Sequence, residues 1–147
     1  MANTRHQIQV WTNNPTRKEA LASGTIYPGM AVVRTSATAD TVIASNVADV
    51  DIKPLLIGIE GELLGREISV PYTAGERVSM FVPYPGDEIL ALVAAGQNIA
   101  KGDYLTPDGN GYWKKVATTE AKVLQAREAL DISATGAVAD HILAEVC

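Results

Sequence analysis

Alternation between apolar and polar residues is the dominant pattern of this chain. It occurs over residues 7–11, 30–34, 77–82, 88–93 and 141–146, and a period of two is typical of strands that bury one face. Glycine and proline separate these segments, so turns are expected between them. The pattern predicts about nine or ten short strands.

One segment fits a strand and a helix equally well. Residues 116–130 include EAK at 120–122 and AREAL at 126–130, which have high helix propensity although the neighbouring segments are β-like. Both interpretations stay open there. Elsewhere the chain lacks the helical patterns of about 10 to 15 residues that βαβ units place between strands. We therefore predict an all-β fold with minor helix, in the form of a compact β-sandwich or barrel.

One turn pattern occurs twice along the chain. Residues 94–111, AAGQNIAKGDYLTPDGNG, place Ile99 between two glycines and ahead of an apolar strand, and residues 22–33 place Ile26 in a similar arrangement. Glycine can adopt the positive φ that a tight reversal needs. We therefore expect the chain to use one turn device in both places, with a structural role.

Length and composition are consistent with one compact domain. A chain of 147 residues can bury a core without the help of a metal or a disulfide. Only one Phe, two Trp and five Tyr are present, so the core must consist mainly of Val, Ile, Leu and Ala. Such a core suits a small barrel or sandwich.

The charge of the chain argues against a nucleic-acid partner. The net charge is -5 and the pI is near 4.9, whereas phosphate binding depends on clustered Lys and Arg. The basic doublets Arg17-Lys18 and Lys114-Lys115 are expected to be solvated surface. Apolar runs stay short of the roughly 18 residues of a membrane helix, and the N-terminus lacks the apolar core of a signal peptide. We expect synthesis without export and no membrane partner.

Candidate catalytic groups are few. A nucleophile needs a base within hydrogen-bond reach, and the two histidines are His6 in a polar segment and His141 at the start of the last predicted strand. The single cysteine, Cys147, is the last residue and cannot form an intramolecular disulfide. An ordinary chain end is favoured over a His141–Cys147 pair, and no GxSxG motif occurs. We predict that the chain is not an enzyme.

Metal and cofactor sites are not predicted either. The carboxylate pairs at Asp49 with Asp51 and at residues 87–88 do not resemble a calcium loop. DGNG at 108–111 shares residue types with such loops but lacks the later Glu ligand, so a plain turn is favoured. Lys101 at a hairpin tip invites comparison with carrier domains that modify a lysine, but the Met-Lys-Met environment of biotinyl domains is absent.

Three segments carry a family resemblance, and they are YPGMAV from Tyr27, VPYPGDEILALVAAGQNIAKGDYL from Val82, and DGNG from Asp108. Together they resemble the head decoration proteins of tailed phages, which are also called cement proteins. The resemblance covers roughly residues 24–147 and is strongest between residues 83 and 111.

The resemblance implies a fold, an assembly and a location. The fold is a β-tulip-like domain over residues 15–147 with an extended N-terminal arm over residues 1–14. Lambda-type decoration proteins sit as trimers on the icosahedral shell and tie neighbouring major capsid subunits together. The resemblance therefore implies a homotrimer on the capsid surface of the virion, made in the host cytoplasm, which binds the major capsid protein and stabilises the mature head. It implies binding without catalysis and without a cofactor.

The N-terminal arm supplies the predicted contact with the capsid. Lambda-type proteins use such an arm to add strand pairing to the capsid, and an extended arm gains main-chain hydrogen bonds while an aromatic side chain anchors it. The matching interface candidates here are Ile8, Val10, Trp11, Asn13 and Asn14. The alternative is that residues 7–11 form the first strand of the domain's own sheet.

Two other functions stay open at this point. The first is a β-clip or carrier-like binding module of a cellular enzyme, and a mass increase on Lys101 would indicate it. The second is a hydrolase with an unrecognised site, whose activity would be lost on mutation of His141.

Overall fold

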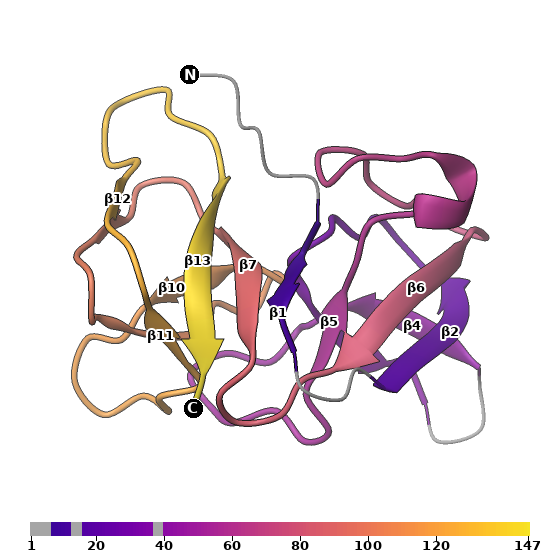
Figure 1. Cartoon of the computed structure of the whole chain (residues 1–147), viewed down its shortest axis with the longest axis horizontal. Helices are drawn as coiled ribbons and strands as arrows, with labels where there is room; N and C mark the ends of the chain where they lie inside the picture. The colour runs from indigo at the N-terminus through magenta and orange to yellow at the C-terminus, as the bar shows by residue number, and fades with distance from the viewer. Residues whose placement is uncertain (1–6, 13–15, 37–39) are drawn as a thin grey trace.

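Strands make up nearly all the regular structure of this protein (Figure 1). The computed structural model describes residues 7–12, 16–36 and 40–147. Within these ranges it contains thirteen strands and one short 3-10 helix, η1 (Glu62–Leu64). The all-β prediction is therefore confirmed. More strands are present than the sequence predicted, because several contain only two or three residues, too few to show a period of two.

The first half of the chain closes into a barrel of five strands. The order around it is β2-β4-β3-β5-β6, and β6 pairs back with β2. Alternate residues of these strands, such as Val32, Val78 and Met80, form its core. The bounds are β2 (Thr16–Ala22), β3 (Ala31–Arg34), β4 (Thr41–Ala44), β5 (Leu56–Gly58) and β6 (Arg77–Val82).

The second half of the chain forms a ring of the same size. Its strands pair in the order β7-β10-β9-β11-β13, and β13 pairs back with β7, so these five strands also close on themselves. The ring lies beside the first barrel in Figure 1. The bounds are β7 (Glu88–Val93), β9 (Tyr104–Pro107), β10 (Trp113–Lys115), β11 (Leu124–Ala126) and β13 (Asp140–Val146).

The two barrels have the same topology. Numbered along the chain within each barrel, the strands follow the same order, first-third-second-fourth-fifth. The first and third strands pair in parallel in both barrels, and the other four pairings are antiparallel in both. Because the strand order and the strand directions agree, the two barrels repeat one arrangement of strands.

The paired residues of the two barrels correspond as well. The register is the same in all five pairs of neighbouring strands. Representative correspondences are Ala22–Val42 with Val93–Trp113, Leu21–Arg77 with Leu92–His141, Val33–Ile43 with Thr106–Lys114, Val32–Leu56 with Leu105–Leu124, and Ile57–Phe81 with Gln125–Glu145. The two halves are therefore structural repeats of one barrel.

The repeated turn pattern belongs to this duplication. Ile26 forms a bridge with Tyr72 ahead of β3, and Ile99 pairs with Leu130 ahead of β9. The glycine that follows each isoleucine and precedes the next strand has a φ of 92° in the first barrel and 93° in the second. The prediction that one turn device is used twice therefore holds for the second glycine of the pattern, whereas of the first glycines only Gly96 has a positive φ, of 88°.

The segment that the sequence left open between helix and strand contains strands. It includes β11 and the start of β12 (Leu130–Asp131), which pairs with β8 (Asn98–Ile99). Pairing with β9 and β13 on either side holds β11 in an extended conformation. Tertiary pairing thus outweighs the local helix propensity of this segment.

A hydrophobic cluster reaches from the second barrel to the first, and the interior of the first barrel has a separate core. Ile57, Ile59 and Phe81 of the first barrel belong to the same buried cluster as the inward-facing residues of β7 and β13. The side chain of Ile8, just before β1 (Gln9–Trp11), belongs to that cluster too. The barrels therefore form one packed unit.

Candidate functional site

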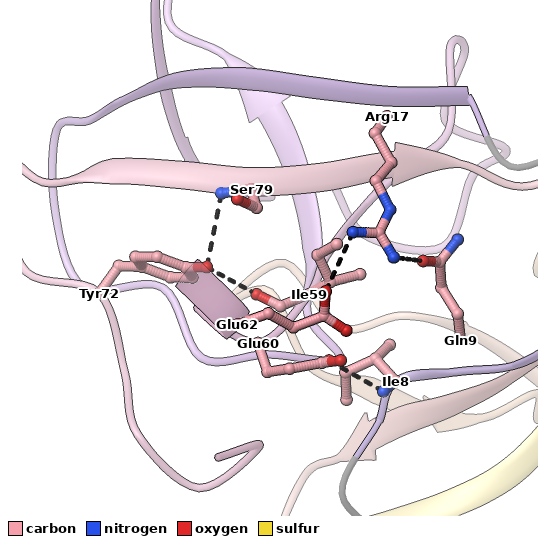
Figure 2. Close-up of polar contacts among 8 residues, drawn as sticks. All are labelled: Ile8, Gln9, Arg17, Ile59, Glu60, Glu62, Tyr72 and Ser79. Carbon is pink, nitrogen blue, oxygen red and sulfur yellow. Dashed lines mark hydrogen bonds and ion pairs between the residues drawn. The ribbon is translucent and has the colours of Figure 1, made fainter. Parts of the chain in front are cut away.

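The contact between the two barrels involves β1, the turn at Gly29 and a cleft. β1 lies between the barrels and pairs antiparallel with β7 (Figure 1). The Leu90 N–H donates to the Ile8 carbonyl oxygen at 2.8 Å. On the side of the first barrel, the Ile8 N–H donates to a carboxylate oxygen of Glu60 at 3.0 Å (Figure 2). β1 is thus bound to both barrels.

A group of polar side chains fixes β1 to the first barrel. Arg17 of β2 donates to the side-chain oxygen of Gln9 at 2.9 Å and to a carboxylate oxygen of Glu62 at 3.2 Å (Figure 2). Glu60 is only 4% exposed, and burial raises the pKa of its carboxyl, with a smaller upward contribution to the pKa from Glu62 and an opposing one from the hydrogen bond to Ile8. The group of polar side chains that fixes β1 therefore contains a carboxyl whose ionised form is disfavoured by burial.

The turn that contains Gly29 joins the barrels from the other side. The carbonyl oxygen of Gly29 accepts hydrogen bonds from the Trp113 indole N–H and from the Leu92 N–H, both at 3.1 Å. Its φ is 92°, and a Cβ at this position would lie 2.8 Å from the Leu90 carbonyl oxygen. The glycine of the YPGM sequence is therefore required for close contact between the barrels.

His141 also serves this contact. Its Nε2 lies 2.9 Å from the carbonyl oxygen of Pro28. Cys147 follows the end of β13, about 20 Å away along an extended strand, and burial raises the pKa of its thiol. The structure does not bring these two residues together as a nucleophile and base.

The predicted interface residues have different environments. Ile8 is 0% exposed, whereas Val10 and Trp11 are 48% and 59% exposed. The register between β1 and β7 shifts between Gln9 and Trp11, which breaks the simple alternation. Residues 9–11 thus form a strand of the domain's own sheet, and Asn13 and Asn14 lie outside the described residues. Contact of Val10 and Trp11 with a partner stays a prediction.

A cleft of about 410 Å³ opens where the barrels meet. Side chains from both barrels line it, and the principal ones are Tyr27, Glu67, Ile68, Leu92, Tyr112, Val138, Asp140 and His141. Sequence patterns could not identify this set, because its members come from separate segments without a common motif.

The described ranges contain no group of three or more His, Cys, Asp or Glu side chains that could hold a metal ion. Among the same residues, no helix combines the length and the apolar character needed to cross a membrane.

The architecture defines the fold as a pair of repeated five-stranded β-barrels that pack against each other through one buried cluster. A solved structure has a similar fold: the crystal structure of the head fiber gp8.5 N base in bacteriophage phi29 matches with a TM-score of 0.59 over 91% of this chain and 95% of that chain. The sequence identity is 12%, so the likeness is one of fold, and it extends over both barrels. No protein-family model matches the chain, and no curated protein sequence matches it.

Proposed function

We propose that this chain is a structural component of a bacteriophage head. The observation that carries the proposal is the similarity of fold, over 91% of the chain, to the base of a phage head fiber. The resemblance of residues 82–105 to head decoration proteins supports the same assignment independently, because it rests on sequence motifs and not on the fold.

The more specific role that we propose is that of a decoration protein. In this role the chain binds the outside of an icosahedral capsid and cements neighbouring major capsid subunits, as a homotrimer on the virion. Only the assembled lattice presents the complete binding site, so binding shifts the equilibrium toward the assembled shell. Many modest contacts add up across the lattice. A rigid unit suits this role, and the buried cluster that joins the two barrels supports such rigidity.

A second role is favoured by one observation. The solved structure with the similar fold named above is described as the N base of a head fiber. A base of this kind would attach a projecting fiber to the head instead of joining capsid subunits. Both roles require the chain to bind a phage head, and they differ in whether the bound chain makes empty shells more resistant to heat.

The C-terminal end of β1 is the surface that we assign to head binding. Val10 and Trp11 are 48% and 59% exposed although both are apolar, and partly exposed tryptophan is the residue type most often found as an interface anchor. Ile8 belongs to the core, so the contact begins after it.

Binding of the purified protein to heads that lack it tests the proposal. Trp11→Ala should weaken binding at least about tenfold, as expected for loss of an interface anchor. Leu63→Ala is the matched control, because Leu63 is an apolar residue of η1 that is 92% exposed. Failure of the unmodified protein to bind heads would contradict the head role. Equal binding by Trp11→Ala would contradict only the assignment to β1.

A further inference from the structure

The cleft between the barrels has the size and position of a binding site. Its volume is about 410 Å³, within the range of about 300 to 1,000 Å³ that is typical of ligand pockets. Such pockets often lie where two structural units meet. The turn at Tyr27 and the loop at residues 67–69 form one side, and Leu92, Tyr112 and residues 138–141 form the other.

The walls of the cleft are held in place by the contacts that join the barrels. Tyr27 directly precedes the turn whose Gly29 carbonyl oxygen accepts the Trp113 indole N–H at 3.1 Å. Tyr112 directly precedes Trp113, and His141 is fixed by its contact with the Pro28 carbonyl oxygen at 2.9 Å. The site is therefore formed before a ligand binds, which lowers the entropic cost of binding.

The lining combines an apolar floor with aromatic and acidic groups. Ile68 and Leu92 are each 5% exposed and form the floor. Tyr27 and Tyr112 both line the cleft, and burial raises the pKa of Tyr112, with a smaller increase from the neighbouring Tyr27. Glu67 is an exposed carboxylate among the lining residues. An anionic or purely apolar ligand would leave these groups poorly matched.

Two carboxylates line the cleft in the part of the chain that the structure describes. Glu67 and Asp140 line it together with His141, and no Lys or Arg is among the described lining residues. The neighbouring cation, Arg66, is committed to Glu76, with a hydrogen bond of 3.0 Å. The chain as a whole carries a net charge of -5. The complementary ligand is therefore a cation with an apolar stem.

We propose that this cleft binds an arginine side chain presented by a partner protein. A guanidinium group can stack on a phenol ring while its N–H groups donate to a carboxylate, and the methylene stem covers apolar surface. Lysine offers a compact charge that cannot stack in this way. The inference concerns the chemistry of the cleft and goes beyond the head role, on which it does not depend.

Titration of the whole protein with a short peptide tests this inference by NMR. The probe is acetyl-Gly-Arg-Gly-amide, compared with peptides that carry lysine or citrulline in place of arginine. We expect saturable shifts of the ring signals of Tyr27 and Tyr112 with the arginine peptide, weaker binding of the lysine peptide, and no saturation with the neutral citrulline peptide. Equal affinity for any two of the three peptides, or no saturation by the arginine peptide at about 10 mM, would overturn the inference.

Two variants locate the binding groups. Glu67→Gln and Asp140→Asn should each weaken binding of the arginine peptide about tenfold, the change expected from loss of one charge-assisted hydrogen bond. Asp51→Asn removes an exposed carboxyl that does not line the cleft and should leave binding unchanged. An equal effect of all three substitutions would show a general charge effect and contradict the site. Binding to heads is measured separately, so its failure would leave this result intact.

Discussion

The two barrels share strand order and register, yet their first strands have opposite surroundings. Ile89 and Leu90 of β7 are 0% and 1% exposed, whereas Lys18 and Glu19, at the corresponding positions of β2, are exposed. β1 lies beside this part of β7. In the described part of the chain, no strand lies beside Lys18 and Glu19 on the side away from β6.

The comparison shows that the same pattern of strand pairing can carry apolar side chains in one barrel and charged side chains in the other. Where the barrel meets its neighbour, the first strand is apolar because both of its faces and its edge are covered. Where the barrel faces outward, charged residues occupy the equivalent positions. Charges on an open strand edge discourage pairing with other chains, and polar outer faces are typical of terminal repeats. The charged residues of β2 therefore suit a strand whose outer edge is not covered by a second barrel.

The largest expected effect on stability comes from exchanging the residue types of β7 and β2. Ile89→Lys places a charge in the buried cluster that joins the barrels and should lower the free energy of unfolding by at least about 4 kcal/mol. The reciprocal change, Lys18→Ile at the corresponding exposed position, should alter it by less than about 0.5 kcal/mol. Denaturant unfolding measures both changes.

The reciprocal variant also tests whether the charge protects the edge. Lys18→Ile should increase self-association, measured by light scattering after size exclusion. A Lys18→Ile variant with the same oligomeric state as the native chain at high concentration would show that the edge needs no protection. Similar destabilisation by both substitutions would contradict the account of the two strands.

The equivalent turn glycines should differ by a smaller amount. At Gly29, alanine would bring its Cβ within 2.8 Å of a backbone oxygen at a φ of 92°, whereas at Gly102 the φ is 93° and no atom lies within 4 Å. Gly29→Ala should therefore cost about 3 kcal/mol, from the clash together with the strained φ, and Gly102→Ala about 1 kcal/mol. Equal costs in denaturant unfolding would show that Gly29 does not hold the barrels together.

The smallest expected effect concerns the buried carboxyl that holds β1. The pKa of Glu60 is raised above its ordinary value of 4.5, so the folded chain binds this proton more tightly than the unfolded chain. Its contribution to stability is therefore largest below pH 4.5 and is lost as the pH rises through the raised pKa. Glu60→Gln keeps an oxygen that can accept the Ile8 N–H and removes the titration. The variant should gain stability relative to the native chain as the pH rises from 4 to 8.

The control for this pH series is Glu67→Gln, which removes an exposed carboxyl near the same loop and is measured under the same conditions. Glu76, whose pKa Arg66 lowers to about 2, contributes with the opposite sign and only in acid. A pH profile of Glu60→Gln that matches the native profile would show that Glu60 does not titrate in this range.

Local patterns predicted much of the fold. The strands predicted at 77–82 and 88–93 have those bounds in the structure, and the last strand begins one residue earlier than predicted. Alternation is visible in these segments because each is long enough and faces a core on one side. β8 and β12 contain two residues each and carry no such signal.

The duplication and the cleft could not be predicted from the sequence. Only the turn pattern around Ile26 and Ile99 repeats visibly, because corresponding strand positions hold different residues, such as Ile57 and Gln125. Pairing between distant strands preserves the register without preserving the side chains. The buried position of Ile8 was not foreseen for a similar reason, since it depends on β7 and Glu60, which are remote in sequence.

The most direct test of the proposed head role is the composition of purified phage particles. Heads from the phage that carries this sequence should contain the chain in a fixed, repeated copy number, measured by quantitative mass spectrometry, and should retain it through density-gradient purification. Absence of the chain from purified particles, or a copy number that varies between preparations, would contradict the proposal that it is a structural component of the head.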